Sequence, residues 1–430
     1  MVSNKRTAGE SRGTGLGPSR RLLLSLLVRA LPAGAAQSQC SAAVPPVLRH
    51  PILDASAVCS PLVDDTTRPT PADYSPWTHA PICENSTADD KKKYCVYTNS
   101  RHGHSGISLL TRPEIAADSV SIVDEYLNLR SNQSVPYKIV DIPGKGKGVV
   151  ATRLIKRYEP IMMDYSVLLI DMGFATEVPA KKGYRLLHAA VDWLEDPDSV
   201  LTLGQSNGLA QDPIENVLRT NGFHTMLGGG QHMALYPLVS RINHACKPNA
   251  YNRFGLNSLQ VVVVAAARDI QPGEEITISC PCTNTPVDIT LGKTTPERIQ
   301  SLKLWSFDCT CDLCTAPAPE RAASDARRAK IDDLRDQAIA AFQAGKPYQA
   351  LRLTRQVINL LPTEELFPVY AEQYENMARI YFVLRDKENA VKWAKQSLDT
   401  LVEQGYLDRV RPEHFIRMWQ KFHEEEGGRY

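Results

Sequence analysis

Runs of apolar residues predict strands along the first two thirds of the chain. Residues 94–100 and 106–111 are short apolar segments joined by a polar linker, as in paired strands. Residues 137–155 are typical of two strands around the glycine turn Gly144–Gly148, and the valine-rich run at 258–270 predicts a buried strand. Because helical segments follow, the pattern as a whole predicts an α+β fold.

Helical spacing marks residues 113–130 and 183–224, and it dominates the last hundred residues. There, residues 338–361 resemble residues 377–401 at an offset of 40. The matched positions are Ala338 and Ala378, Phe342 and Phe382, Ala350 and Ala390, and Leu361 and Leu401. Each unit predicts a helix, a polar turn and a second helix, as in tetratricopeptide-like repeats. With a last helix at 412–423, we expect a small bundle with a groove that either binds a protein partner or only braces the preceding domain.

Length and charge narrow the function classes. The chain has 430 residues, of which 43% are hydrophobic, and a formal net charge of +1. This length suits about three domains. A balanced charge argues against a nucleic-acid binder that works by bulk electrostatics. No run beyond the first 40 residues approaches the roughly 20 apolar residues of a membrane helix. We therefore expect no direct nucleic-acid partner and no membrane span.

The first 40 residues have the layout of a secretory signal. Arg20 and Arg21 precede the apolar run Leu22–Val28, and small residues follow, although Arg29 interrupts the apolar part. An Arg-rich start with few acidic residues also fits a mitochondrial transit peptide, and a disordered tail is the third interpretation. A cleaved signal favours the secretory route, whereas an uncleaved one favours the nucleus or the cytoplasm.

Ten cysteines fall into an early and a late group. The early group could form two disulfides in the secretory route but would stay reduced elsewhere. Its members are Cys40, Cys59, Cys83 and Cys95.

The late group contains a CxCxxC motif, which supplies three soft ligands where a structural Zn²⁺ takes four. Cys309, Cys311 and Cys314 form the motif, and Cys246 and Cys282 are the candidates for the fourth ligand. Disulfides are the alternative, but Cys309 and Cys311 are too close along the chain to pair without strain.

Three polar stretches follow one another: LYPLVSRINHACKPNA at 235–250, ARDIQPGEEITIS at 267–279 and LKLWSFDCTCDLC at 302–314. Each feature has an ordinary explanation when taken alone. The glycine loop suits a plain hairpin turn, His244 suits a core histidine, and asparagines beside proline are common turn formers. Their fixed order along one chain is more specific than any single motif.

Together with the glycine loop, these stretches resemble the SET-domain protein methyltransferases, in particular the SET-and-MYND branch. The resemblance covers roughly residues 135–425, and a helical-repeat tail is part of it. Residues 165–235 contain no cysteine, so the cysteine-rich MYND module is missing. Residues 41–130 resemble an N-terminal segment of fungal SET proteins.

The resemblance implies a SET-domain β-fold with a knot-like crossing, a post-SET zinc loop and an all-α tetratricopeptide-like tail. The implied divisions are a signal-like or disordered start at 1–40, an N-terminal extension at 41–134, a SET domain at 135–281 with a helical insert at 165–235, a post-SET zinc segment at 282–318 and helical repeats at 319–430.

The resemblance also implies two ligands, S-adenosylmethionine and Zn²⁺. The glycine loop would approach the S-adenosylmethionine closely, because glycines carry no side chain. The implied cofactor-binding residues are Lys145, Gly146, Lys147, Gly148, Asn221, Asn243, His244 and Phe307. The implied zinc ligands are Cys246, Cys309, Cys311 and Cys314.

Catalysis is where the sequence departs from the family. Family members have a tyrosine after the GEEITIS strand, and its hydroxyl borders the lysine channel, but this chain has Cys280. A thiol is a weak hydrogen-bonding group, and losing one preorganised group costs about 3 kcal/mol in a transition state. Tyr236 and Tyr251 are the candidates that could partly replace the lost ring.

Two functions are therefore predicted. The first is an S-adenosylmethionine-dependent methyltransferase of protein or peptide lysine, with weak or altered activity. The alternative is a noncatalytic SET scaffold that binds a protein partner through its helical C-terminal region.

Overall fold

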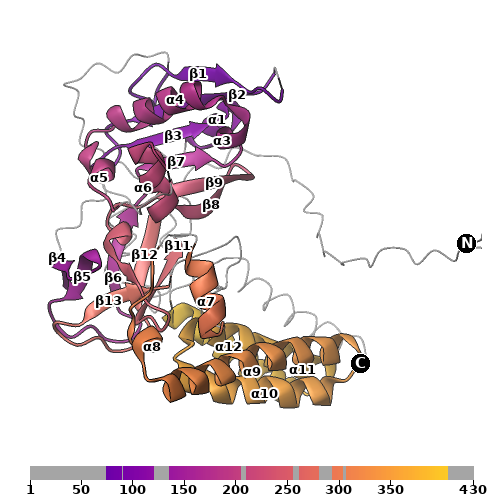
Figure 1. Ribbon diagram of the computed structural model, residues 1–430. Coiled ribbons are helices and arrows are strands. Elements are labelled where there is room, and N and C mark those ends of the chain that lie inside the picture. Colours follow the sequence, from indigo (N-terminus) through magenta and orange to yellow (C-terminus); the bar gives the residue numbers. More distant parts are fainter. Residues whose placement is uncertain are drawn as a thin grey trace, which may run out of the picture. The chain divides into compact units, whose positions relative to one another are not determined.

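The computed structural model describes residues 74–89, 91–120, 135–204, 210–254, 261–279, 293–303 and 307–404 (Figure 1). The chain divides into the units Met1–Val44 and Pro45–Tyr430, and every described residue lies in the second. Of the predicted features, Cys40, Cys59, Cys280, Cys282 and the helix at 412–423 lie outside the described residues.

A six-stranded sheet joins two distant parts of the chain. Its order is β1-β2-β3-β7-β9-β8, and β3 pairs in parallel with β7 while the other pairs are antiparallel. The strands are β1 (Ile82–Asn85), β2 (Lys93–Asn99), β3 (Ile107–Thr111), β7 (Leu168–Asp171), β8 (Phe223–Leu227) and β9 (Gly230–Leu235). The strands predicted at 94–100 and 106–111 are thus confirmed as β2 and β3.

Both faces of this sheet are covered, which explains why every residue of β3 is buried. Alternate residues of a strand point to opposite faces. Ile107 and Leu109 belong to one core cluster, and Leu110 belongs to another. The second cluster also contains Leu186 and Val191 of helix α4 (Ala180–Asp192). The short helix α1 (Pro113–Asp118) contributes to the first cluster.

Two smaller sheets contain the motifs. The four-stranded sheet has the order β10-β13-β5-β4, and the three-stranded sheet has the order β11-β12-β6. Their strands are β4 (Tyr137–Ile142), β5 (Gly146–Ala151), β6 (Pro160–Tyr165), β10 (Asn243–His244), β11 (Ala250–Phe254), β12 (Val261–Ala266) and β13 (Glu275–Ile278). The two strands predicted at 137–155 are confirmed as the hairpin β4–β5, and the run at 258–270 contains β12.

The insert at 165–235, predicted to be helical, contains strands as well as helices. Its helices are α3 (Phe174–Glu177), α4, α5 (Asp198–Leu201) and α6 (Pro213–Asn221). Its two ends instead form β7 and the hairpin β8–β9, which turns at Gly228 and Gly229 with φ of 53° and 74°. A glycine pair with positive φ favours a tight hairpin. The helical spacing at 183–224 concealed this local signal.

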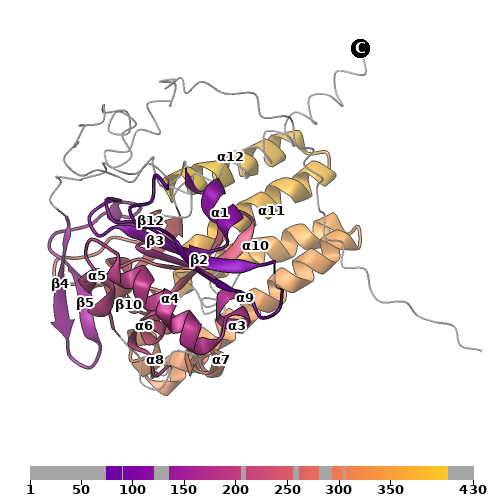
Figure 2. The same ribbon diagram turned by 90° about the horizontal axis from the view of Figure 1, so that it is seen from above.

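The helical region confirms the predicted helix–turn–helix units. Figure 1 and Figure 2 show four helices side by side: α9 (Ala318–Gln343), α10 (Pro347–Glu364), α11 (Tyr370–Val383) and α12 (Lys387–Glu403). The turns of the two hairpins contain Gly345 (φ 69°) and Arg385 (φ 60°), which are 40 residues apart and adopt the same left-handed conformation. The repeat is therefore visible in the backbone as well as in the sequence.

One pair of the early cysteines forms a disulfide. Cys83 and Cys95 face each other in the β1–β2 register and are bonded. The late cysteines Cys246, Cys309, Cys311 and Cys314 carry free thiols. Within the described part of the chain, no helix is both long and apolar enough to cross a membrane.

Candidate functional site

The short strand β10 brings the three polar stretches together. Asn243 and His244 form this strand, which runs parallel to β13 with Asn243 opposite Thr277. The Asn243 side-chain Nδ2 donates to the carbonyl of Lys147 (3.2 Å) and to Oε1 of Glu275 (2.9 Å). One amide therefore ties the glycine loop to the strand that leads towards position 280.

Gly148 has to be glycine because Asn243 lies against it. A Cβ at this position would lie 2.8 Å from the Asn243 Nδ2 and 2.5 Å from Cγ1 of Ile142. Both distances are shorter than any ordinary carbon contact. The space between Gly148 and Asn243 therefore has no room for a side chain on the loop.

The rest of the glycine loop is a hairpin turn. Gly144 and Gly146 have φ of 76° and 72°, a left-handed conformation that favours glycine. Lys145 Nζ pairs with Oε2 of Glu275 at 2.7 Å, and Lys147 Nζ pairs with Asp141 at 2.8 Å. The ordinary explanation of the loop as a turn is therefore correct, and its contact with a cofactor stays a prediction.

The two glutamates of the GEEIT stretch have separate partners that the sequence did not reveal. Glu275 joins Lys145 to Asn243, as described above. Glu274 accepts from Nδ2 of Asn249 (3.0 Å) and from Arg268 (2.6 Å). The buried Asn249 also accepts from the backbone N–H of Thr277 at 2.8 Å. The contacts of Glu275 with Asn243 and of Asn249 with Glu274 and Thr277 together hold β13 in place.

Asp164 also has a role at this site that the sequence did not reveal. Its Oδ2 accepts from the backbone N–H groups of Leu238 (2.6 Å) and Val239 (2.8 Å), at the start of the turn Val239–Arg241 that precedes β10. The carboxyl is buried, and desolvation raises its pKa to about 7. The Asp164 side chain therefore fixes the position of the turn that leads into β10.

The CxCxxC sulfurs gather around Cys246. The sulfurs of Cys246, Cys309, Cys311 and Cys314 all lie within 4.8 Å of one another. Cys246 Sγ is 3.8 Å from the Sγ of Cys309 and 3.6 Å from that of Cys314. A tetrahedral Zn²⁺ with bonds of about 2.3 Å separates its sulfurs by about 3.8 Å. The four residues thus fit a zinc ion in both chemistry and spacing.

Within the cluster, the neighbouring thiols favour a thiolate at Cys311. Hydrogen bonds from the thiols of Cys246 and Cys309 lower the pKa of Cys311. A thiolate is the form that binds metal. Helix α8 (Asp312–Thr315) holds Cys314, whose backbone N–H donates to the carbonyl of Cys311 at 2.9 Å.

His244 and Phe307 lie at the edge of the sulfur cluster. His244 Nε2 is 3.3 Å from the Sγ of Cys246, and burial lowers the pKa of the imidazole to about 4. The histidine is therefore neutral near pH 7. The half-exposed ring of Phe307 meets the His244 ring edge-on, with centroids 6.0 Å apart. Two predicted cofactor residues thus contact each other directly.

Asn221 is the last residue of helix α6, and its side chain forms hydrogen bonds with backbone carbonyls. Its Nδ2 donates to the carbonyls of Gly204 (2.7 Å) and Val217 (2.9 Å). Arg241 donates to the carbonyl of Thr202 (2.9 Å), so the two residues contact the same short segment. This places Asn221 near the chain that leads into β10.

The structure does not bring the two candidate tyrosines together. Tyr236 is fully buried in the main core, edge-on to Phe223. Tyr251 packs with Phe367 of the helical region in a separate cluster, and its hydroxyl donates to the carbonyl of Gln404 at 2.9 Å. The strand that leads to Cys280 runs beside His244, since Ile278 pairs with it.

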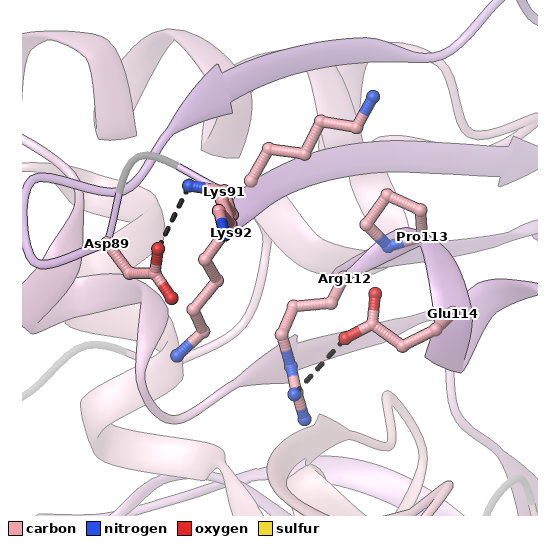
Figure 3. Close-up of a pocket in the computed structure, with 7 residues that line it drawn as sticks. Asp89, Lys91, Lys92, Arg112, Pro113 and Glu114 are labelled. Carbon is pink, nitrogen blue, oxygen red and sulfur yellow. Dashed lines mark hydrogen bonds and ion pairs between the residues drawn. The ribbon is translucent and has the colours of Figure 1, made fainter.

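Two hollows lie away from these residues. One of about 470 Å³ is lined by Asp89, Lys91, Lys92, Lys93, Arg112, Pro113 and Glu114 (Figure 3). Arg112 points towards Glu114 there and forms an ion pair with it at 3.2 Å. The other, of about 560 Å³, lies between α9 and α11 and includes Phe342, Gln373 and Ile380. Neither includes a predicted cofactor or zinc residue.

Comparisons with known proteins bear on the same segment. The SET domain family matches residues 146–280. The chain is 28% identical over 241 residues to histone-lysine N-methyltransferase set5 of Schizosaccharomyces pombe, a match that covers 54% of this chain and 66% of set5. It is 38% identical over 106 residues to the SET domain-containing protein SmydA-8 of Drosophila melanogaster, covering 24% and 21% of the two chains.

A third relative, N-lysine methyltransferase SMYD2-B of Danio rerio, is 30% identical over 98 residues, which are 22% of this chain and 20% of the relative. The chain thus spans slightly less than two thirds of set5 and about a fifth of the other two. The family match contains β10, β13 and the glycine turn from Gly146 onwards. Residues 146–280 are therefore the segment of this chain that is similar to the SET domain.

Proposed function

We propose that this chain is an S-adenosylmethionine-dependent protein-lysine methyltransferase. The observation that carries the proposal is the junction at β10, where Asn243 contacts the glycine loop and the next two residues lead into the four-sulfur cluster. The names of the relatives support the reaction class. Histones are the first substrates to test, because set5 is named as a histone-lysine methyltransferase.

The proposed cofactor site comprises the glycine loop Lys145–Gly148 together with Asn221, the β10 residues and Phe307. Bound S-adenosylmethionine would supply the methyl group on its sulfonium. Gly144 and Gly146 support this assignment, because a Cβ at either position would meet nothing within 4 Å and the loop backbone there is not covered by side chains. The neutral His244 imidazole adds no positive charge beside a cationic sulfonium.

The finer architecture is part of the same proposal. Cys246 would join the CxCxxC thiols as a zinc ligand and pin a post-SET segment at 282–318, and the crossing around β10 would form the knot-like feature of SET folds. Residues 319–430 would form tetratricopeptide-like repeats behind a SET domain at 135–281. The sulfur spacing and the two equivalent hairpins support these assignments.

For catalysis, the lysine amine has to arrive neutral and in line with the bond that breaks. Much of the acceleration in such a reaction comes from positioning the two reactants. Cys280 stands where the SET-domain family has the tyrosine that borders the lysine channel, so we propose position 280 as the channel residue. Because a thiol at position 280 is a weaker hydrogen-bonding group than the family's tyrosine hydroxyl, we expect weak turnover. Tyr236 and Tyr251 are the candidates to replace that hydroxyl.

Cofactor binding is the first test. Titration calorimetry with S-adenosylmethionine should give saturable binding, and Asn243→Ala should weaken it at least tenfold. Asn389→Ala in α12, which also loses a side-chain hydrogen bond, is the matched control and should bind like the original chain. No binding at millimolar cofactor would remove the enzyme proposal.

Position 280 is the second test. Radiolabelled methyl transfer to histones is compared between the original chain and Cys280→Tyr. An active but altered enzyme should gain only modestly, whereas a chain that binds cofactor but lacks turnover should gain about a hundredfold, the value of one preorganised hydrogen-bonding group.

A noncatalytic SET scaffold is the second candidate, and the Cys83–Cys95 disulfide favours it. Disulfides persist mainly in oxidising compartments, where the lysine substrates and the main pool of S-adenosylmethionine are absent. The hollow between α9 and α11 would then serve a protein partner. Mass spectrometry of the chain from its native source should detect the disulfide and a processed N-terminus if this candidate holds, and reduced thiols with an unprocessed N-terminus if it does not.

A further inference from the structure

A buried ion pair connects the helical region to the sulfur cluster. Glu364, at the end of α10, is 2% exposed and accepts from three donors. These are Ser324 Oγ (2.6 Å), Arg327 Nε (2.6 Å) and Arg328 Nε (2.8 Å). The carboxylate is therefore fully engaged, and its contacts hold the start of α9 against the end of α10.

Arg328 extends this network into the SET domain. Its side chain is 0% exposed, and its second terminal nitrogen donates to the main-chain carbonyl of Cys246 at 3.1 Å. The backbone N–H of Cys246 is 3.4 Å from the sulfur of Cys311. The peptide groups on both sides of the Cys246 Cα are thus held by partners distant in sequence.

Residues next to Glu364 and Cys246 form a second connection between the helical region and the SET domain, at the surface. Glu365 follows Glu364 with a φ of 54°, and it pairs with Lys247 at 2.9 Å and with Arg268 at 3.4 Å. These partly exposed pairs add little stability. They do connect the same two points, the end of α10 and the residue after Cys246. Glu365 therefore contacts Lys247 directly, whereas Glu364 is connected to the neighbouring Cys246 through Arg328.

A structural role alone does not require charges at this place. Burying an ion pair costs desolvation energy, and apolar residues of similar volume often replace such pairs with no loss of stability. A guanidinium differs from an apolar side chain because its donors point in fixed directions. Arg328 uses this fork to bind a carboxylate and a carbonyl at once, and the carbonyl belongs to a proposed zinc ligand.

We propose that Arg328 and Glu364 are positioning residues for the sulfur cluster. They orient the Cys246 backbone so that its thiol completes the set of four and the preceding strand β10 keeps its register. The helical region would thereby control how firmly the SET domain holds metal. This proposal rests on the proposed zinc site, whose own failure has a separate signature in the test below.

The test measures zinc in the full-length chain. Zinc content is determined by mass spectrometry, and the rate of zinc release to a chelator is followed with a chromogenic dye. Arg328→Lys and Glu364→Gln should release zinc about 10–100 times faster, the usual effect of removing a group that orients a metal ligand. The matched control is Glu372→Gln, which breaks the ion pair between Arg335 and Glu372 without touching Cys246.

A paired substitution separates positioning from folding. Arg328→Met with Glu364→Met removes both charges, so its thermal unfolding should match that of the original chain while its zinc release stays fast. Release at the original rate from this variant would overturn the proposal, and so would equally fast release from Glu372→Gln. A chain that contains no zinc at all would instead refute the zinc site itself.

Discussion

Gly148→Ala tests the junction between the glycine loop and β10. The new methyl group would lie 2.5 Å from Cγ1 of Ile142 and 2.8 Å from Nδ2 of Asn243. The Ile142 side chain is half-buried and can rotate at a modest cost. Asn243 is bound to Lys147 and Glu275, so its movement breaks hydrogen bonds.

The expected cost follows from these contacts. Overpacking by one methyl group costs about 1–3 kcal/mol, and the weakened hydrogen bond to the Glu275 carboxylate adds about 1 kcal/mol or more. We therefore expect Gly148→Ala to lower the free energy of unfolding by about 3 kcal/mol. Gly146→Ala is the matched control. A Cβ there meets nothing within 4 Å, so only the left-handed φ of 72° is penalised, at about 1–2 kcal/mol.

Urea unfolding followed by circular dichroism measures both variants, and calorimetry measures their affinity for S-adenosylmethionine. Gly148→Ala should lose more stability than Gly146→Ala and should bind cofactor more weakly, because Asn243 is displaced. Equal losses in the two variants would refute the reasoning. They would mean that the loop is only a turn and that its distance from Asn243 has no importance.

Three further predictions concern other parts of the site. Cys309→Ser should abolish zinc binding in metal analysis, whereas Cys83→Ser should leave it intact, since that cysteine lies in the disulfide. Burial raises the pKa of Asp164 above its ordinary value of 3.8 to about 7, so the folded state binds an extra proton between about pH 4 and 7 and this contribution to stability falls as the pH rises. The stability of the original chain relative to Asp164→Asn, measured by urea unfolding, should therefore decrease across that range, and a constant difference would contradict the assignment. Tyr251→Phe should cost about 1 kcal/mol in thermal unfolding through loss of the hydrogen bond to Gln404, and an unchanged transition would argue against that contact.

Local patterns predicted the local structure well. The hairpin β4–β5, the strands β2 and β3 and the two helical hairpins all follow from residues near one another in sequence. The meeting of Cys246 with the CxCxxC motif came from the family pattern, because spacing alone left Cys282 as an equal candidate. The structure brings the sulfur of Cys246 to the other three, and Cys282 lies outside the described residues.

Contacts between distant segments could not be predicted in this way. Arg328 occurs in a helix rich in charged residues, where an arginine is usually solvated, yet it reaches a carbonyl 82 positions away. The parallel pairing of β3 with β7 joins Leu109 to Leu169. Hydrophobic periodicity reports which face of an element is buried. It does not identify the partner that buries it.

The β3–β7 pairing also determines which fragments of this chain should be soluble when they are expressed without the rest. A piece cut at the limits of the SET family match, 146–280, would contain β7 and β9 but would lack β1, β2 and β3. The buried edge of β7, with Leu168, Leu169 and Ile170, would then face water with unpaired backbone groups. Exposed apolar edges of this kind pair with other chains. Such a fragment should aggregate, and a soluble one has to begin before Ile82, where the first strand of the six-stranded sheet starts.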